Sequence, residues 1–253
     1  MSTPGQTAFN ECYHTNLDFY KYCAIVDPVK GLRFSHAMIQ VAEASLRFFE
    51  ASYPLKQLPA SSIIVDVAGG LGQTAIYLAE RLSKHRFVVF DYASVIQEGR
   101  AQCPVHLQSR VRYEAHDMFQ SYQELEGGDG DQVFILKQVL HDWSDKDCVQ
   151  ILSKVLEALG QSGRILIIDS VKPIEQVSLS TAMSELMVMS MFGGFHRTYA
   201  QYERLIRATA CNVSLRSWCV NAGQHDDMLV IEIKPGVVAG SRMSTSYTRA
   251  KGL

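Results

Sequence analysis

The stretch VDVAGGLGQTA, residues 65–75, decides the fold because it joins an apolar run of strand length to a helix. The run IIVDVA (63–68) leads into the turn, and QTAIYLAERLSK (73–84) follows it with helical spacing. Glycine allows a sharp turn and a close approach of the backbone to a ligand. A tight turn is therefore predicted between a buried strand and a helix whose free N–H groups face a ligand. The glycines of this turn are Gly69, Gly70 and Gly72.

The remainder of the chain repeats this alternation of strand and helix. Four more strand-like runs, separated by helical or loop segments, are RFVVFD (86–91), VRYEAHDMF (111–119), DQVFILKQ (131–138) and GRILIIDSV (163–171). Such alternation indicates a parallel sheet with helices on both faces. Two last runs, 213–220 and 228–235, are close enough in sequence to pair as a hairpin. We predict an α/β fold with a mostly parallel, Rossmann-like, seven-stranded sheet that closes with an antiparallel C-terminal strand.

The chain divides into three regions. Residues 1–55 contain two helical stretches interrupted at Asp27–Pro28 and form a short helical segment ahead of the sheet. Residues 56–235 carry the alternating strands and helices. Residues 236–253 are polar and rich in small residues, which predicts a disordered tail.

Composition argues against several classes of function. With a net charge of −2 and no long basic run, the chain is not expected to bind nucleic acid. The polar N-terminus lacks an apolar signal region, and no apolar run reaches the ~18 residues of a membrane span, so we expect a cytoplasmic protein outside the membrane. The six cysteines include no CxxC pair, which fits neither a disulfide framework nor a zinc site.

Acidic residues near the ends of three strands predict a nucleoside-bearing ligand. Asp91 ends the strand about 20 residues after the glycines, where a carboxylate can accept hydrogen bonds from both hydroxyls of a ribose. Asp66 suits a ligand with a cationic amino group, which S-adenosylmethionine (SAM) has and a dinucleotide lacks; alternatively, it caps the N–H groups of its own loop. Asp117 and Met118 could contact an adenine, or could be a helix cap and a core methionine.

Five segments resemble one known family. VDVAGGLG, VFDYASVI, HDMF, LKQVLHDWSD and GGFHRT are similar, in this order, to the SAM-dependent, metal-independent O-methyltransferases of plant and fungal secondary metabolism, the caffeate-type family. The resemblance covers roughly residues 8–235. It implies a class I methyltransferase sheet, SAM as the cofactor, no metal, and a small hydroxylated metabolite as the acceptor.

The same resemblance implies individual roles. His141 matches the catalytic base, Lys137 a lysine on the cofactor side, and Trp143 the aromatic residue beside the base. Gly69 and Gly70 would face the methionine part of SAM. The full predicted cofactor site is Asp66, Gly69, Gly70, Gly72, Asp91, Asp117, Met118 and Lys137.

The chemistry of methyl transfer suits a histidine at this place. Displacement at a sulfonium methyl lacks only a good nucleophile, and a phenol or acidic enol has a pKa near 10 or below, whereas histidine has one near 6.5. A positioned imidazole can take the proton, which is worth ~10²–10⁴ in rate. Asp169 could accept the other imidazole N–H and fix the tautomer. The alternative for His141 is a loop histidine with a purely structural role.

The sequence departs from the family pattern at four points. Ala68 replaces the first glycine of the loop, which a negative φ would accommodate. Asp169 is one methylene shorter than the usual glutamate. His196 replaces an acid before Arg197, so one of the two acids expected beside the base is missing; we keep His196 with His141 and Asp169 as catalytic candidates. The first 55 residues resemble the end of a longer dimerisation and substrate-lid region, so the usual dimer is expected to be reduced or absent. A homodimer and a partner enzyme of the same pathway are the two protein partners that we consider.

Apolar residues after the fifth strand predict an acceptor pocket. Their near-helical spacing, together with Trp143, suits an aromatic or polyketide-like acceptor, and plain core packing is the alternative. Phe34 and Met38 could approach the same pocket from the N-terminal helix. The predicted pocket residues are Trp143, Met183, Met187, Met191 and Phe192.

Three functions are therefore compared. The first is an O-methyltransferase with His141 as general base. The second is a methyltransferase-fold protein without methyl transfer, such as a pericyclase, a dehydratase or an auxiliary subunit, which His196 and the short N-terminal segment suggest. The third is an NAD-dependent oxidoreductase, which only the loose pattern Gly70-x-Gly72-x-x-Ala75 suggests.

Overall fold

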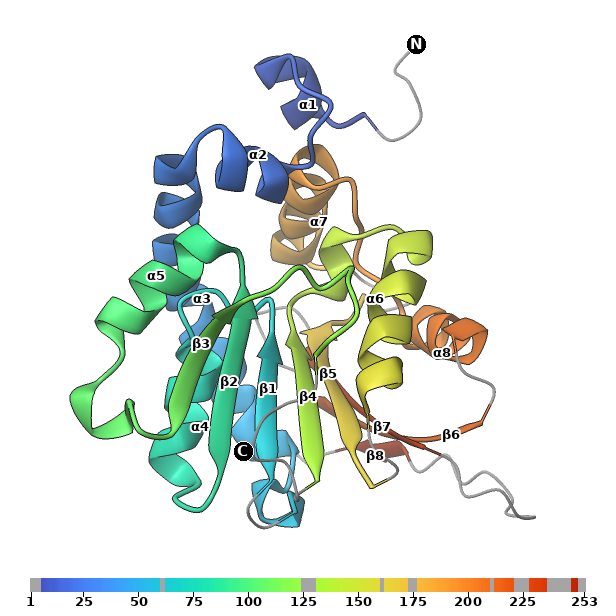
Figure 1. The fold of residues 1–253 in the computed structure, drawn as a ribbon. Coiled ribbons are helices and arrows are strands. Elements are labelled where there is room, and N and C mark those ends of the chain that lie inside the picture. Colours follow the sequence, from blue (N-terminus) through green and yellow to red (C-terminus); the bar gives the residue numbers. More distant parts are fainter. Residues whose placement is uncertain are drawn as a thin grey trace.

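A single mixed sheet forms the centre of the molecule in the computed structural model, which describes residues 6–59, 62–123, 131–159, 162–172, 177–209, 212–220, 228–235 and 247–249. The strand order is β3-β2-β1-β4-β5-β7-β6-β8 (Figure 1). The strands are β1 (Ile63–Val67), β2 (Arg86–Asp91), β3 (Val111–Ala115), β4 (Gln132–Lys137), β5 (Arg164–Ser170), β6 (Val213–Val220), β7 (Met228–Pro235) and β8 (Tyr247–Arg249).

Strand directions confirm the predicted fold class. Neighbouring strands among β1 to β5 pair in parallel, and β7 lies antiparallel between β5 and β6. The expected hairpin of the last two strands is thus present. An eighth strand, β8, pairs in parallel with β6. The other residues of the expected tail, 236–246 and 250–253, lie outside the described residues.

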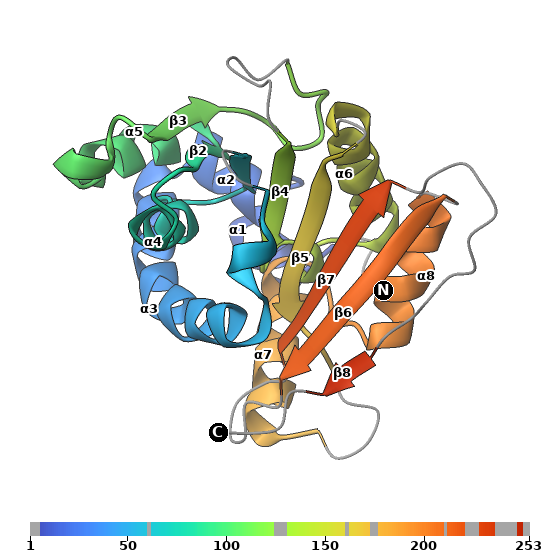
Figure 2. The same cartoon turned by 90° about the horizontal axis from the view of Figure 1, so that it is seen from below.

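Helices cover both faces of the sheet (Figure 2). One face carries α3 (Pro28–Ser52), α4 (Gln73–Arg81) and α5 (Ala93–Gln102), and the other carries α6 (Asp145–Ala158) and α8 (Tyr199–Thr209). Side chains of β1 alternate between the two layers, because successive residues of a strand point to opposite faces. Ile63, Val65 and Val67 pack towards α6 and α8, whereas Ile64 packs towards α3 and α4.

The N-terminal helices lie across the end of the sheet at which the parallel strands finish (Figure 1). They are α1 (Ala8–Tyr13) and α2 (Phe19–Ile25), and they lie beside α7 (Leu179–Met191). The predicted interruption is confirmed: Asp27 accepts a hydrogen bond from the backbone N–H of Lys30, and Pro28 begins α3. Phe9, Phe19 and Cys23 form a small core that also contacts Phe192. The described helices include none long and apolar enough to cross a membrane.

Candidate functional site

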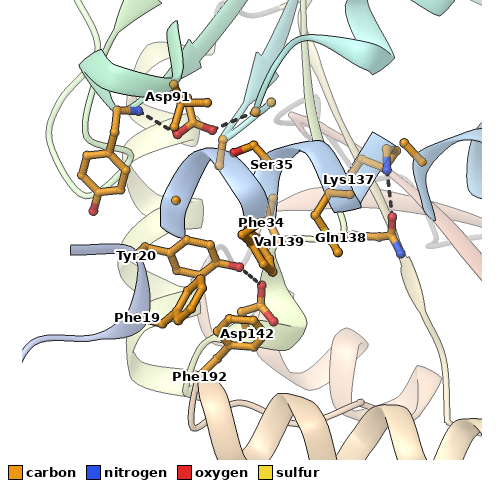
Figure 3. A pocket seen from close by; sticks show the side chains of 18 of the residues that line it. Phe19, Tyr20, Phe34, Ser35, Asp91, Lys137, Gln138, Val139, Asp142 and Phe192 are labelled. Atoms are coloured by element: carbon orange, nitrogen blue, oxygen red, sulfur yellow. Dashed lines mark hydrogen bonds between the residues drawn. The ribbon is translucent and has the colours of Figure 1, made fainter. Parts of the chain in front are cut away.

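A cavity of about 460 Å³ opens at the carboxyl ends of the parallel strands, beneath α2 and α7. Ligands of open α/β sheets bind at this edge. Residues from the glycine loop, β2, β4, α2, α3 and α7 line it (Figure 3). The sequence-predicted residues that line it are Asp66, Gly69, Gly70, Asp91, Asp117, Met118, Lys137, His141, Trp143, Met187, Met191, Phe192 and His196.

The glycines of the loop have different roles. A Cβ on Gly69 would lie 2.6 Å from the carboxylate of Asp66, so a side chain at this position would collide with a cavity-lining group. Gly72 is not among the residues that line the cavity, and its predicted cofactor contact stays a prediction. It precedes α4 with a φ of 85°, and a Cβ there would lie 2.5 Å from the hydroxyl of Tyr113.

Ala68 has a φ of 51°, in the left-handed region, so the expectation of a negative φ is wrong. A Cβ in this region lies too close to the following carbonyl oxygen, which costs about 1–2 kcal/mol. The family's glycine would avoid this cost. Gly70 has a similar φ of 59°, and a Cβ built there meets nothing within 4 Å.

We expect Ala68→Gly to raise the free energy of unfolding by about 0.5–1 kcal/mol, because the relief of strain exceeds the entropy lost by ordering a glycine. Urea denaturation without ligand measures it. Gly70→Ala is the matched control, since it adds the same strain without a clash, and it should lower stability by a similar amount. An unchanged or lower stability of Ala68→Gly would contradict the strain at Ala68.

Asp66, which is buried, and Lys137, which is half-buried, lie at the wall of the cavity and influence each other electrostatically. Burial raises the pKa of Asp66 to about 7, against the attraction of Lys137 and hydrogen bonds from the Ala75 N–H and Thr74. Its Oδ2 is buried without a hydrogen-bond partner. Burial lowers the pKa of Lys137, and Asp66 opposes this shift. Asp66 thus accepts hydrogen bonds from the first turn of α4 (Gln73–Arg81) rather than from the glycine loop, and its Oδ2 is left without a hydrogen-bond partner among the described residues.

Asp91 and Asp117 lie on the rim of the cavity near the glycine loop. Asp91 Oδ2 accepts a hydrogen bond from Gly70 N at 2.8 Å, and Oδ1 accepts one from Tyr92 N at 2.7 Å (Figure 3). A carboxylate oxygen has a second lone pair, so Asp91 can still accept a hydroxyl on each oxygen. Asp117 accepts a hydrogen bond from Phe119 N and also lines the cavity.

His141 lies between two buried carboxylates. Its Nδ1 is 2.5 Å from Asp169 Oδ1, and its Nε2 is 3.3 Å from Asp142 Oδ1. Burial alone would lower the pKa of His141, but Asp169 and Asp142 outweigh it and raise the pKa to about 9. For the carboxyl group of Asp169 burial acts in the opposite direction and would raise the pKa, but the neighbouring His141 outweighs it and lowers the pKa. From the sequence we expected one of the two acids beside His141 to be missing. Asp142, the residue that follows His141 in the chain, is a second carboxylate beside its imidazole.

Buried groups from the late loop hold this arrangement. The ring of His196 lies edge-on to that of His141, with centroids 5.5 Å apart. Arg197 is fully buried and donates to the carbonyl oxygens of Leu140 and Trp143, which lie on either side of His141 in the chain. It also pairs with Asp145 at 2.7 Å. Arg197 therefore fixes the backbone on both sides of His141.

The charge of His141 predicts how stability varies with pH. A histidine whose folded pKa is raised contributes stability fully below its unfolded pKa of ~6.5, and this stability is lost as the pH rises through about 9. From pH 7 to 9.5 the wild type should lose roughly 2–3 kcal/mol more than His141→Gln. Urea unfolding of both proteins at the two pH values measures the difference. Equal losses would contradict a raised pKa of His141.

The family model for the O-methyltransferase domain matches residues 4–210. The chain belongs to this O-methyltransferase family. It is 36% identical over 233 residues to O-methyltransferase SAT18 of Stachybotrys chartarum, and the matched region covers 92% of this chain and 58% of that protein. The solved structure of the mitomycin 7-O-methyltransferase MmcR superposes with a TM-score of 0.77 at 24% identity, covering 92% of this chain and 64% of the other.

A further solved structure, described as a pericyclic reaction enzyme, superposes with a TM-score of 0.71 at 22% identity and covers 90% of this chain and 58% of its own. Identities this low show a shared fold only. This O-methyltransferase chain spans about half the length of the first curated relatives that it matches.

The wall of the cavity that α2 and the end of α7 form is aromatic. Tyr20 stacks on Phe192 with ring centroids 5.3 Å apart. Trp143 and Phe34 also contact the ring of Tyr20. Met183 is 64% exposed and does not line the cavity, so its predicted pocket role is wrong. Met183 lies eight residues before Met191 on α7, which at 1.5 Å per residue is about 12 Å along the helix axis and carries Met183 away from the cavity.

Two residues of the site escaped the sequence analysis. Asp142 follows the predicted base directly and precedes the start of α6, where Ser144 accepts a hydrogen bond from Asp147 N. The adjacency of His141 and Asp142 was a usable signal. Tyr20 lies 122 residues from Asp142 and donates to it, and no local pattern announces that contact. Among the described residues, no group of three or more His, Cys, Asp or Glu side chains could hold a metal ion.

Proposed function

We propose that this chain is a SAM-dependent O-methyltransferase that uses His141 as the general base for a small hydroxylated acceptor. The observation that carries the proposal is the contact of His141 Nδ1 with the buried carboxylate of Asp169, at the wall of the cavity that also holds Asp66 and Asp91. The matched family and the name of its relative SAT18 support the reaction class.

The cofactor half of the cavity fits SAM. The partnerless Oδ2 of Asp66 is available to a cationic amino group, and an acid inside a buried strand is otherwise costly to bury. Gly69 lets the backbone approach, and Asp91 retains acceptor capacity for ribose hydroxyls. Asp117 and Met118 line the adenine side that the resemblance implies. SAM, when bound, supplies the electrophilic methyl group.

The chain's own residues prepare the acceptor. Asp169 fixes the imidazole of His141 through Nδ1, which leaves Nε2 as the atom that can receive a hydroxyl proton. A pKa of about 9 keeps the ring largely protonated at neutral pH in the free protein. A cation placed in the same cavity lowers the pKa of a neighbouring histidine, so ligand binding favours the basic form. The aromatic side chains around Tyr20 hold a planar acceptor and exclude water.

Product mass tests the proposal. The protein is incubated with methyl-labelled SAM and a panel of phenols and enols, and products are analysed by mass spectrometry. A labelled product heavier by one methyl group in place of a hydrogen supports O-methyl transfer. Calorimetric titration with SAM and with NAD separates the two cofactor classes, and binding of NAD alone would overturn the assignment.

The same assay addresses a methyltransferase fold without methyl transfer. A product of unchanged mass but altered retention, formed only with SAM present, would favour a pericyclic rearrangement. Loss of water from the substrate would favour a dehydratase. Either result would remove His141 as an acceptor base while leaving the cofactor site intact.

A further inference from the structure

We propose that Tyr20 is a positioning residue of this site: its hydroxyl fixes Asp142 against Nε2 of His141 and so controls how the imidazole exchanges its proton. The inference rests on the proposed function, because it concerns the same base. It adds a residue from the N-terminal helical segment to the machinery of the sheet edge. No motif in the sequence assigns Tyr20 a role.

The contact itself is direct. Tyr20 Oη donates a hydrogen bond to Asp142 Oδ2 at 2.5 Å (Figure 3). Asp142 is 5% exposed, and its other oxygen, Oδ1, has no hydrogen-bond partner among the described residues. That oxygen lies 3.3 Å from Nε2 of His141. Because one oxygen is held, the direction in which the other points is set by Tyr20.

Aromatic rings hold Tyr20 in this place. Its ring is stacked on Phe192 with an interplanar angle of 10° and lies against Trp143 at 24°. Phe19 and Phe34 contact its ring edge-on. Rings packed on both faces and edges leave the hydroxyl few alternative directions. The hydrogen bond is therefore a fixed feature of the packing of α2 against α7.

Charge gives the contact a chemical consequence. Burial raises the pKa of Asp142 to about 6, and His141 and the Tyr20 hydroxyl oppose that shift. Burial and the nearby Asp142 raise the pKa of Tyr20, so the phenol stays protonated and remains a donor. Without this donor, Asp142 would take up a proton more readily and become neutral near pH 7. His141 would then lose one of its two carboxylates and hold its own proton less tightly.

The other charged groups around His141 come from separate elements and do not change in this comparison. Asp169 belongs to β5, Lys137 to β4, and His196 to the loop before α8. The acid of α7, Glu185, pairs with Lys172, and Asp18 pairs with Lys21 beside α2. The titratable groups that face His141 or Asp142 are thus Tyr20, Asp169, Lys137 and His196, besides these two residues themselves.

Tyr20→Phe tests the inference, since it keeps the ring and removes only the donor. Histidines are labelled with ¹³C at Cε1, and His141 is followed by NMR through pH in the cofactor-free protein, with His141→Gln to assign the signal. We expect the midpoint in Tyr20→Phe to fall by about one pH unit below that of the wild type. Asp142→Asn should shift it similarly, and the double variant should shift it no further than Asp142→Asn.

Tyr22→Phe is the matched control. Tyr22 lies on the same helix and contacts Phe9 and Tyr13 instead of the cavity, so its loss should leave the midpoint unchanged. An unchanged midpoint in Tyr20→Phe would overturn the inference, as would a double variant that shifts further than Asp142→Asn. The titration needs no methyl transfer, so it succeeds or fails independently of the product-mass assay. Where transfer occurs, the lower limb of the pH–rate profile should move in the same direction.

Discussion

Replacement of His141 by alanine is expected to slow methyl transfer by about 10²–10⁴-fold, the usual contribution of a positioned general base. The side chain is 12% exposed at the cavity wall, and its Nδ1 is fixed by Asp169 at 2.5 Å. Removing it leaves SAM and acceptor in place but gives the hydroxyl proton no acceptor of suitable pKa. The measurement is single-turnover transfer of labelled methyl at saturating SAM.

Two controls make this result specific. His141→Gln keeps a polar side chain of similar length but cannot accept a proton, so it should be as slow as the alanine variant. His106→Ala removes a histidine whose side chain is 65% exposed, and it should transfer at the wild-type rate. Recovery of activity in His141→Gln would mean that His141 only positions the acceptor. SAM affinity should remain close to that of the wild type in all three variants, because neither His141 nor His106 belongs to the proposed cofactor site.

The sequence was most informative where function depends on local order along the chain. The glycine loop, Asp91 and the segment around His141 each follow directly from a strand end, so alternation of strand and helix placed them at one edge of the sheet. The alternation of strand and helix predicted the sheet and its hairpin, and most of the predicted site residues line the cavity.

The sequence-based predictions fail, or miss a residue, where the position of a side chain depends on a backbone torsion angle or on contacts between distant parts of the chain. The φ of Ala68 could not be inferred from residue type, because alanine usually avoids the left-handed region. Met183 was assigned by spacing alone, and only the packing of α7 determines which face points inward. The contact of Tyr20 with Asp142 depends on how α2 crosses the sheet end, which no local pattern encodes.

Gly194 shows the same dependence on tertiary contacts. Its replacement should have the largest effect on methyl transfer after that of His141. A Cβ at this position would lie 2.1 Å from the carbonyl oxygen of His141 and 2.4 Å from the carbonyl carbon of Asp142. These are backbone atoms, which cannot move aside as the tip of a side chain can. Gly194→Ala must therefore displace the segment η3 (Leu140–Asp142), which carries His141, the proposed base.

We expect Gly194→Ala to lower kcat/KM by about 10²-fold, because a displacement of about 1 Å in a reacting geometry costs that much. Overpacking should also reduce the free energy of unfolding by about 1–3 kcal/mol. SAM affinity, measured by calorimetry, should stay near the wild-type value, since Gly194 does not line the cavity. Gly69→Ala should show the reverse pattern, because its methyl group meets Asp66 and Val89 on the cofactor side and SAM affinity is lost first. Wild-type turnover in Gly194→Ala would mean that the base tolerates displacement, and the tight geometry assigned to His141 would then be wrong.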